Sequence, residues 1–306
     1  MKKLEYTVDA KDQGERLDRF LASRGNLSRG EARRQLDKGA VWIDDLRVKI
    51  ASKPVNQGQR VVVVLEEGGR TEPAVQKLEP ERVLFQDDHL IAVDKPVGVP
   101  AQATLGSDRG NLVTLVSDLV GRDVGLVHRL DLETSGVTVF AKTKPATAAL
   151  AEAFRVGTAH KRYLAVAVGT LPDELRCELP ISPDGRRWGK FRAMEAGKVP
   201  AATRFKVLAR NGTACAVECF PETGRTHQIR VHLKALGAPI AGDDLYGGPK
   251  EVETASGKIA AARVMLHARW LEVPHPVTGQ VVKFQAPVPK DLETLLLALG
   301  VDAGKL

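Results

Sequence analysis

The sequence predicts an α+β protein, in which a large domain with a mostly antiparallel sheet follows a small α/β module. Three observations support this fold class. Short apolar runs typical of strands are separated by single helices over most of the chain. Amphipathic helices followed by strands occupy the first 65 residues, and a stretch rich in Gly, Pro and charge separates the two parts. We therefore expect a module at 1–65, a linker at 66–79 and a large domain at 80–306.

Composition narrows the class and the location. The chain has 306 residues, of which 43% are hydrophobic and 27% charged, as in ordinary globular proteins. No apolar run approaches the roughly 18 residues of a membrane helix, and the first residues lack the apolar core of a signal peptide. We expect a cytoplasmic protein without a membrane partner. The spacing of Cys177, Cys215 and Cys219 favours buried thiols over a disulfide or a zinc site.

Charge is concentrated at one end of the chain. The net charge is +7, and residues 1–65 hold 14 Lys and Arg against 9 Asp and Glu. A compact basic module favours a polyanion partner such as RNA or DNA. A solvated basic surface that only keeps the protein soluble explains the charge equally well.

The module begins with two short helices. In GERLDRFLASRG, Leu17, Phe20 and Leu21 share one face, and Gly25 lies just beyond the predicted end. In NLSRGEARRQLDKG, Ser28 and Glu31 form a capping box and Gly39 closes the helix. The basic residues predicted on the exposed sides of this second helix are Arg29, Arg33, Arg34 and Lys38.

The large domain is predicted as strands with few helices. A helix is expected in KPATAALAEAFRVG, with Pro145 in its first turn and Gly157 past its end. KRYLAVAVG is a strand, Asn211-Gly212 is the turn of a hairpin, and a later helix ends near Gly237. Further strands are expected at Val83–Phe85, Leu90–Asp94, Gly125–Val127 and Val137–Ala141.

One turn raises the question of chemistry. The stretch LVHRLDLETSGV, from Leu126 to Val137, places Asp131 in a polar knot between two strands. Asp, Thr, Ser and Gly are all turn-forming residues, so composition alone favours a purely structural turn.

The module resembles the S-four-like RNA-binding domain over residues 14–64, through the order RLDxFLA and SRxxARxxLxxGxVxI. In such domains the second helix lays its basic side chains along an RNA backbone, where phosphate contacts position the protein without reading sequence. The resemblance therefore implies RNA contacts for the basic residues of the second helix, and a partner that is RNA and not DNA.

The large domain resembles the RluA family of RNA pseudouridine synthases over residues 80–290. The motifs are VDKPVGV, HRLDLETSG, KRYLAV, TGRTHQIRVHL, GDDLYG, LHA and HPVTG, in the order of the family. The chain departs from the pattern at Pro100–Gly106, where PAQATLG replaces a V-H-P-like tripeptide. The resemblance implies isomerisation of uridine in RNA, with Asp131 as the essential residue.

This reaction breaks the bond between base nitrogen and ribose, turns the base, and rejoins it through carbon 5. It needs no redox cofactor, nucleotide or metal, because no electrons change hands and no group is lost. It needs a carboxylate oriented toward the ribose, acting as a nucleophile or as a base. The sequence does not decide which of these two roles Asp131 has.

The resemblance assigns further site residues. Arg230 is the expected guanidinium partner that holds Asp131 through two parallel hydrogen bonds, with Arg225 as the next candidate; a structural ion pair or phosphate clamp is the alternative. Tyr163 is expected to stack on uracil, and its hydroxyl is a candidate for moving the carbon-5 proton. Leu266 is expected to be an apolar wall of the same pocket or a plain core residue.

RNA contacts are expected beside the reacting carboxylate. Because the target base must leave its stack, Arg129 is expected to fill the gap. His128 is expected to contact phosphate or to pack, and the spacing of His227 and His232 does not favour zinc.

Three functions compete at this point. They are a pseudouridine synthase, a non-catalytic RNA-binding or ribosome-assembly protein, and a carboxylate-dependent hydrolase in which Glu133 is the available second acid. The motifs favour the synthase, acting as a monomer. Within the family that the chain resembles, an N-terminal S-four-like domain goes with large-subunit ribosomal RNA, so the resemblance implies this substrate, with transfer RNA as the alternative.

Overall fold

A computed structural model describes residues 2–65, 77–185, 189–194, 199–255 and 257–306, and these form two compact units. Unit 1 comprises residues 1–78 and 99–121, and unit 2 comprises residues 79–98 and 122–306. The expected linker at 66–79 lies mostly outside the described residues. Residues 99–121 group with unit 1, whereas the sequence analysis assigned them to the large domain.

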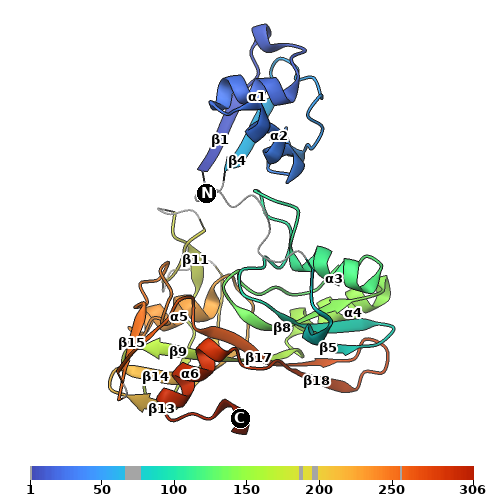
Figure 1. The fold of residues 1–306 in the computed structure, drawn as a ribbon. Helices are drawn as coiled ribbons and strands as arrows, with labels where there is room; N and C mark the ends of the chain where they lie inside the picture. Colours follow the sequence, from blue (N-terminus) through green and yellow to red (C-terminus); the bar gives the residue numbers. More distant parts are fainter. Residues whose placement is uncertain (1, 66–76, 186–188, 195–198, 256) are drawn as a thin grey trace. The chain divides into compact units, whose positions relative to one another are not determined.

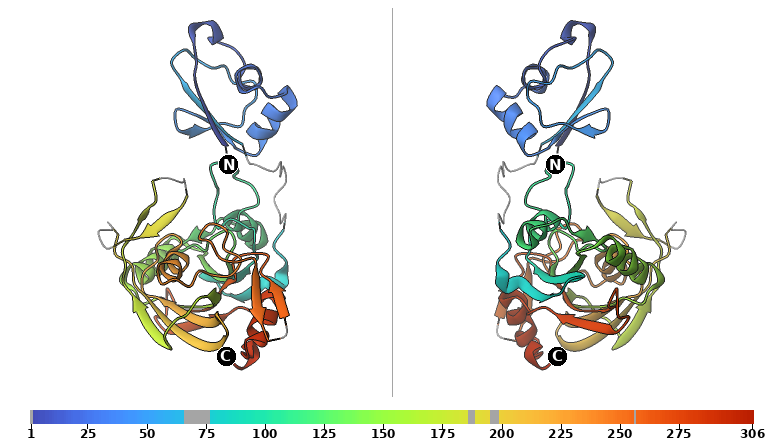
Figure 2. Two further views of the ribbon diagram at one scale, coloured as in Figure 1. Left: turned by 90° about the vertical axis from the view of Figure 1, so that its left-hand side faces the viewer. Right: turned by 90° about the vertical axis from the view of Figure 1, so that its right-hand side faces the viewer.

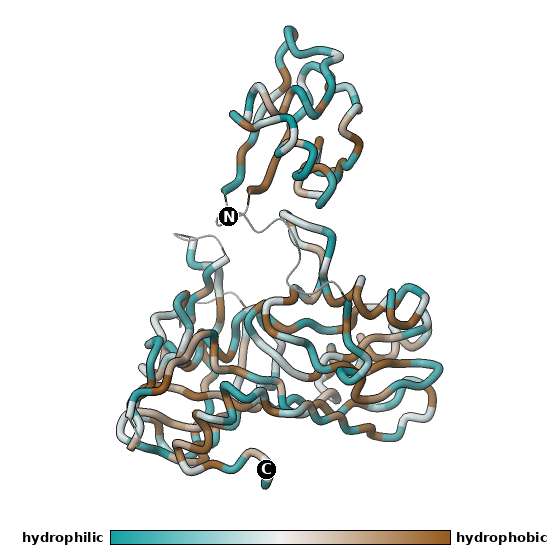
Figure 3. The backbone as a smooth tube through the Cα atoms, in the orientation of Figure 1, coloured by the Kyte–Doolittle hydropathy of each residue, from teal (hydrophilic) through white to brown (hydrophobic). Residues whose placement is uncertain are grey.

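Unit 1 contains the predicted basic module. Its helices are α1 (Leu17–Gly25) and α2 (Arg29–Asp37), and its strands lie in the order β1 (Lys2–Thr7), β4 (Arg60–Leu65), β2 (Val41–Ile43) and β3 (Leu46–Arg47). Both helices cover one face of this sheet (Figures 1 and 2), where Leu17, Phe20 and Leu36 pack on Val61 and Val63. Strand β4 is buried along most of its length and is brown in Figure 3.

The ends of the two helices follow local sequence signals. Ser28 accepts a hydrogen bond from the backbone N–H of Glu31, whose carboxylate accepts one from the N–H of Ser28, so the predicted capping box is confirmed. Gly39 follows α2 with a φ of +78°. Helix α1 includes Gly25 and ends at Asn26, which adopts the left-handed conformation instead of the expected glycine.

A loop of unit 1 lies over the end of α2. The indole N–H of Trp42 donates to the carbonyl of Leu105 at 3.0 Å, and the Lys49 ammonium donates to the Asp108 carboxylate at 3.0 Å. The N–H of Asp108 donates to the carbonyl of Lys38 at 3.0 Å. Lys38 is only 8% exposed, so the prediction of an exposed Lys38 is wrong.

The same segment carries a helix that the sequence analysis did not identify. Helix α3 (Leu112–Val120) is capped by Asn111, whose side chain accepts from the N–H of Thr114. It ends at Gly121, which has a φ of +74°. Short 3₁₀ turns occur at Ala10–Asp12, Pro80–Arg82 and Ala303–Lys305.

Within the described residues, unit 2 is built on a ten-stranded sheet. The order across it is β10 (Glu174–Cys177), β13 (Thr203–Asn211), β14 (Ala214–Pro221), β9 (His160–Val168), β17 (Leu266–Pro274), β8 (Ser135–Ala141), β6 (Leu90–Lys95) and β5 (Val83–Gln86), with β18 (Val281–Gln285) on β17 and β7 (Gly125–Leu126) on β8. Described neighbours are antiparallel except β17 and β8, which are parallel. The predicted α+β class with a mostly antiparallel sheet is confirmed.

Other elements of unit 2 flank this sheet (Figure 1). They are helices α4 (Lys144–Val156), α5 (Gln228–Ala235) and α6 (Lys290–Ala298), and the strand pairs β11 (Ile181–Pro183) with β12 (Phe191–Ala193) and β15 (Glu251–Thr254) with β16 (Gly257–Ala260). Pro145 lies in the first turn of α4 and Gly157 ends it, as predicted. The hairpin ladder closes at the pair Asn211 and Ala214, one residue later than expected.

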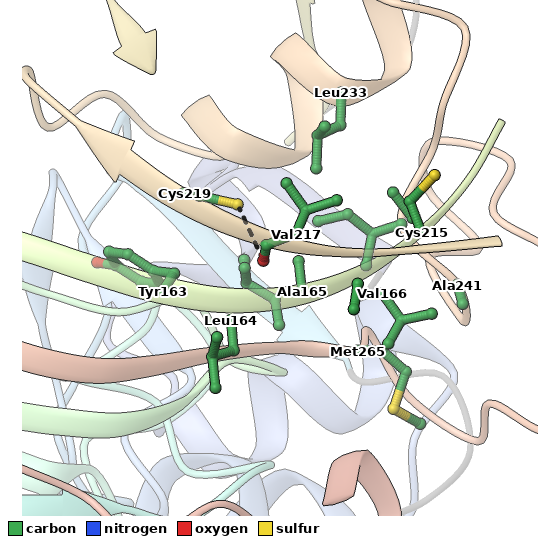
Figure 4. Close-up of a cluster of buried hydrophobic side chains, with 14 of the residues drawn as sticks. Tyr163, Leu164, Ala165, Val166, Cys215, Val217, Cys219, Leu233, Ala241 and Met265 are labelled. Atoms are coloured by element: carbon green, nitrogen blue, oxygen red, sulfur yellow. Dashed lines mark hydrogen bonds between the residues drawn. The ribbon is translucent and has the colours of Figure 1, made fainter. Parts of the chain in front are cut away.

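The main core of unit 2 lies between the sheet and its helices. Figure 4 shows Leu233 of α5 and Val217 of β14 on one face of the sheet, and Leu164 of β9 on the opposite face. The three cysteines are buried free thiols, as the sequence predicted. In the part of the chain that is described, no helix has the length and apolar character to cross a bilayer.

Candidate active site

Asp131 lies in a tight turn immediately before β8. Its carbonyl accepts the N–H of Thr134 at 3.1 Å, and its side chain is 24% exposed. It borders a cavity of about 720 Å³ in unit 2. Gly136 attaches this turn closely to β17, because an added Cβ there would lie 2.2 Å from the carbonyl oxygen of Ala268. The backbone after Asp131 is therefore held in one position.

A buried lysine supports the same turn. Lys95, fully buried at the end of β6, donates to the carbonyls of Pro96 at 3.0 Å and Leu132 at 3.2 Å. The N–H of Gly98 also donates to the Leu132 carbonyl, at 2.9 Å. Burial lowers the pKa of Lys95 to about 7, although the charge of Asp131 acts in the opposite direction. Residues of the VDKPVGV motif thus stabilise the Asp131 turn through hydrogen bonds to the carbonyl of Leu132.

Arg230 joins two carboxylates. One of its N–H groups lies 3.4 Å from Oδ2 of Asp131, while its Nε and second terminal nitrogen donate to Asp243 at 2.7 and 2.8 Å. The expectation that Asp131 accepts both parallel bonds is therefore wrong, because the fully buried Asp243 accepts them. Burial alone would lower the pKa of Arg230, but the hydrogen bonds to Asp243 outweigh it and the pKa is raised. The guanidinium is a fixed positive charge.

Tyr163 and Leu266 form apolar parts of the cavity. The register pairs Tyr163 of β9 with Ala268 of β17, so Tyr163 lies two strands from Gly136 of β8. Tyr163 is 9% exposed and Leu266 is 3% exposed, and both line the cavity. Burial, and then the charge of Asp131, raise the pKa of Tyr163. Its phenol therefore keeps its proton at neutral pH and is a donor there.

Two predicted arginines lie at the cavity as well. Arg129 donates to the hydroxyl of Thr226 at 3.0 Å, and the Nε of Arg225 donates to the carbonyl of Pro200 at 3.1 Å. Both side chains are exposed and line the cavity. Arg225 is thus engaged with backbone, and Arg230 is the arginine beside Asp131.

His128 also borders the cavity, but its contacts are those of a packing residue. Its Nε2 accepts the N–H of Val139 at 2.9 Å, and its ring stacks on Phe154 with centroids 4.5 Å apart. Burial lowers its pKa to about 3, so the ring is neutral. Of the two expectations for His128, these contacts favour packing over phosphate binding.

Four side chains near Asp131 or lining the cavity were not predicted as site residues. They are Asp243, Lys95, Lys161, whose ammonium donates to the Thr223 carbonyl at 3.1 Å, and His227, whose Nε2 lies 3.9 Å from Oδ2 of Asp131. Burial, and then Arg225, lower the pKa of Lys161 to about 8. These four residues lie in motifs that carry the family resemblance, but nothing in the spacing of the motifs indicated that these side chains belong to the site.

The basic residues of unit 1 are organised by a carboxylate. Asp18 of α1 is fully buried and accepts from Arg16 and Arg33 at 3.1 Å and from Arg29 at 3.5 Å. The arginine side chains are 41–53% exposed, so their outer faces are open to solvent. Arg34 is exposed on α2, the helix that also carries Arg29 and Arg33. These contacts lower the pKa of Asp18, with the hydrogen bond from Arg16 as the largest cause.

The geometry in unit 2 suits chemistry on a flat, polar ring carried by an anionic chain. It combines one aimed carboxylate, a fixed guanidinium, an aromatic wall and exposed arginines beside one cavity. Within the described residues, no three His, Cys, Asp or Glu side chains gather closely enough to hold a metal ion.

Comparison with known proteins gives two family matches. Residues 89–235 match the model of the RNA pseudouridylate synthase family, and residues 15–61 match that of the S4 domain. The first range contains Asp131, Tyr163 and Arg230, and the second contains the arginines around Asp18.

Individual relatives cover most of the chain. The ribosomal large subunit pseudouridine synthase D of Xanthomonas campestris pv. campestris is 40% identical, over 80% of this chain and 76% of that protein. The protein of the same name from Neisseria meningitidis serogroup B is 34% identical, over 99% and 83%. The solved structure of human RNA pseudouridylate synthase domain containing 4 is 26% identical, with a TM-score of 0.57 over 72% of this chain and 93% of that one.

Proposed function

This chain belongs to the RluA-type family of RNA pseudouridine synthases and has an N-terminal S4 domain, and we propose that its substrate is large-subunit ribosomal RNA. The enzyme is an isomerase that acts on RNA. Two observations support the large-subunit substrate: relatives that match 80–99% of the chain are named for that subunit, and the S4 unit adds a basic surface outside the catalytic unit. Transfer RNA is the alternative substrate.

We propose Asp131 as the essential carboxylate. The observation that carries this role is its position, on a braced turn at the cavity, 3.4 Å from a guanidinium that is itself fixed by Asp243. Isomerisation requires a carboxylate aimed at the ribose or the base while the bond between them is exchanged. Because the turn and Arg230 already hold the Asp131 carboxylate, it loses little conformational entropy when substrate binds, which favours the reaction.

The remaining cavity residues suit a flipped uridine. Tyr163 offers a ring for stacking and a protonated hydroxyl for a hydrogen bond to the base, and Leu266 offers an apolar contact. Arg129 stands exposed two residues before Asp131, where it can fill the gap that the flipped base leaves. Arg225 and Lys161 add positive charge at the same cavity for phosphate.

Tritium release from uracil carbon 5 tests the substrate. We expect release from large-subunit ribosomal RNA taken from cells that lack this protein, and little release from small-subunit RNA or transfer RNA. Release from transfer RNA alone would replace the proposed substrate while leaving the enzyme class intact. Binding to ribosomal RNA without release from any RNA would favour an RNA-binding function instead.

For the S4 unit, we infer that Asp18 arranges Arg16, Arg29 and Arg33 to bind RNA phosphates. Asp18→Asn removes a negative charge next to a polyanion, so simple charge counting predicts tighter binding. Loss of the ordered arginine cluster predicts weaker binding, because each guanidinium must then be ordered when RNA binds. We expect the second effect to win, with affinity falling roughly 3- to 10-fold.

A filter-binding titration over a range of salt measures this change, well below the unfolding temperature of the variant. Asp37→Asn is the matched control, because this exposed residue of the same unit carries the same charge. We expect the control to bind equally or slightly tighter. Tighter binding by both variants would mean that Asp18 does not organise the RNA-binding arginines.

A further inference from the structure

His227 has an unusual backbone conformation at the first turn of α5. It caps this helix with a φ of 58° and a ψ of 19°, in the left-handed region that residues other than glycine adopt uncommonly, although histidine does so more often than most. Such a conformation costs about 1 kcal/mol or more and persists only where the surroundings hold it. It directs the imidazole to the cavity that Asp131 borders. A strained backbone conformation beside the cavity indicates that the His227 side chain has a functional role there.

Two aromatic rings hold the imidazole. The rings of Phe191 and Tyr246 each lie 5.7 Å from it, centroid to centroid, with their planes at 77° and 86° to its own. Its Nδ1 lies 2.9 Å from the hydroxyl oxygen of Tyr246. The side chain is 17% exposed, and its Nε2 lies 3.9 Å from Oδ2 of Asp131. Both ring nitrogens therefore have defined neighbours.

These neighbours determine which nitrogen carries the proton. Burial lowers the pKa of His227, so the ring is neutral and has a single N–H. A lone pair on Nε2 would face the Asp131 carboxylate, which is unfavourable, whereas an N–H on Nε2 would attract it. Nδ1 is then an acceptor and receives a hydrogen bond from the hydroxyl of Tyr246.

Tyr246 is suited to be that donor. Its hydroxyl oxygen already accepts the N–H of Phe191 at 3.1 Å, so its own proton is free to point at His227. Burial raises the pKa of Tyr246 to about 12, so it keeps this proton. A directional chain results, from the Phe191 N–H through Tyr246 to Nδ1 of His227, and from its Nε2–H toward Asp131.

We propose that His227 is a positioning residue that, as a neutral donor through Nε2, fixes the Asp131 carboxylate together with Arg230. Both groups approach the same oxygen, Oδ2, so the carboxylate is oriented with Oδ1 directed at the substrate. The 3.9 Å separation exceeds a hydrogen bond and shortens when RNA fills the cavity. This inference rests on the proposed role of Asp131.

Two substitutions separate this role from a purely structural one. His227→Asn suits the left-handed backbone but places its amide near the position of Nδ1, where it cannot reach Asp131. His227→Gln suits the backbone less well but carries an N–H near the position of Nε2. A donor role predicts that Gln retains more activity than Asn, and a backbone role predicts the reverse order.

The test uses the full chain with enzyme in excess over RNA, and follows tritium release from carbon 5 in a single turnover. We expect the rate constant to fall about 10- to 100-fold for His227→Asn and less than about 10-fold for His227→Gln, as for loss of one hydrogen bond to a charged group. RNA affinity should stay within about 2-fold for both. An Asn variant as fast as the Gln variant or faster would overturn the proposal.

Tyr246→Phe gives an independent measurement, because it keeps His227 and removes the hydroxyl that donates to Nδ1 and accepts the N–H of Phe191. We expect a several-fold lower single-turnover rate constant at unchanged RNA affinity, and a rate equal to that of the unmodified enzyme would contradict the hydrogen-bond chain. Failure of the proposed function looks different. In that case the unmodified enzyme releases no tritium, or Asp131→Asn releases it as fast as the unmodified enzyme.

Discussion

Asp131→Asn is expected to lower the single-turnover rate of tritium release by at least about 10⁴-fold, as is usual when an enzyme loses its essential reacting group. The variant keeps the shape of the side chain, and the turn persists because its hydrogen bond from Thr134 goes to the backbone carbonyl of Asp131. RNA binding should not weaken. The change removes a negative charge from a cavity lined by Arg129 and Arg225, so affinity should stay equal or rise slightly.

Glu133→Gln is the matched control for this result. Glu133 is exposed two residues further along the chain, and its replacement removes the same charge near the same turn. We expect this variant to retain nearly full activity. If both variants lose activity to the same extent, the charge of the turn matters and not the particular carboxylate. If Asp131→Asn also fails to bind RNA, its role is structural.

Asp243→Asn should have the second largest effect, on stability and on turnover together. Asp243 is fully buried and accepts two bonds from Arg230 and the N–H of Tyr246. Removing one partner of a buried pair leaves the other charge uncompensated, which costs about 3–5 kcal/mol of the free energy of unfolding. Because Arg230 loses its anchor, turnover should also fall about 10²- to 10³-fold. Urea unfolding and tritium release measure the two effects.

The adjacent residue provides the control. Asp244 is 70% exposed and pairs with the exposed Lys250 at 3.1 Å, an interaction worth at most about 1 kcal/mol. Asp244→Asn should therefore change neither the unfolding midpoint nor turnover appreciably. Equal effects of the two substitutions would mean that the Asp243–Arg230 pair has no special importance. Loss of stability without loss of turnover would mean that Arg230 keeps its place without Asp243.

Local features are predictable from the sequence because neighbouring residues determine them. The capping box of α2, the glycine that ends α4 and the alternation of strands with single helices all follow from short-range patterns. The exposure of a side chain is harder to predict from the sequence. Lys38 is an example, because a loop distant in the sequence covers this residue. Helix α3 was missed because its apolar run LVTLVSDLV lies among loop residues.

The site is predictable only in part, for the same reason. Resemblance of motifs identifies Asp131 and Arg230, but not that Asp243 takes both parallel hydrogen bonds of that arginine. GDDLYG contains two adjacent aspartates, and only the tertiary structure buries one and exposes the other. The role of His227 is likewise not predictable from its motif, because it depends on contact with Tyr246, which lies a helix and a loop further along the chain.

Strand β17 has a consequence for how the enzyme is made. It lies between β9, which carries Tyr163, and β8, which follows Asp131, although residues 266–274 leave the ribosome long after both. Pairings between distant segments form slowly, since the intervening chain must first be closed into a loop. Until β17 is synthesised, the edges of β9 and β8 that pair with it therefore remain unpaired. The nascent chain therefore has no assembled catalytic site until β17 has been synthesised and has paired with both neighbours.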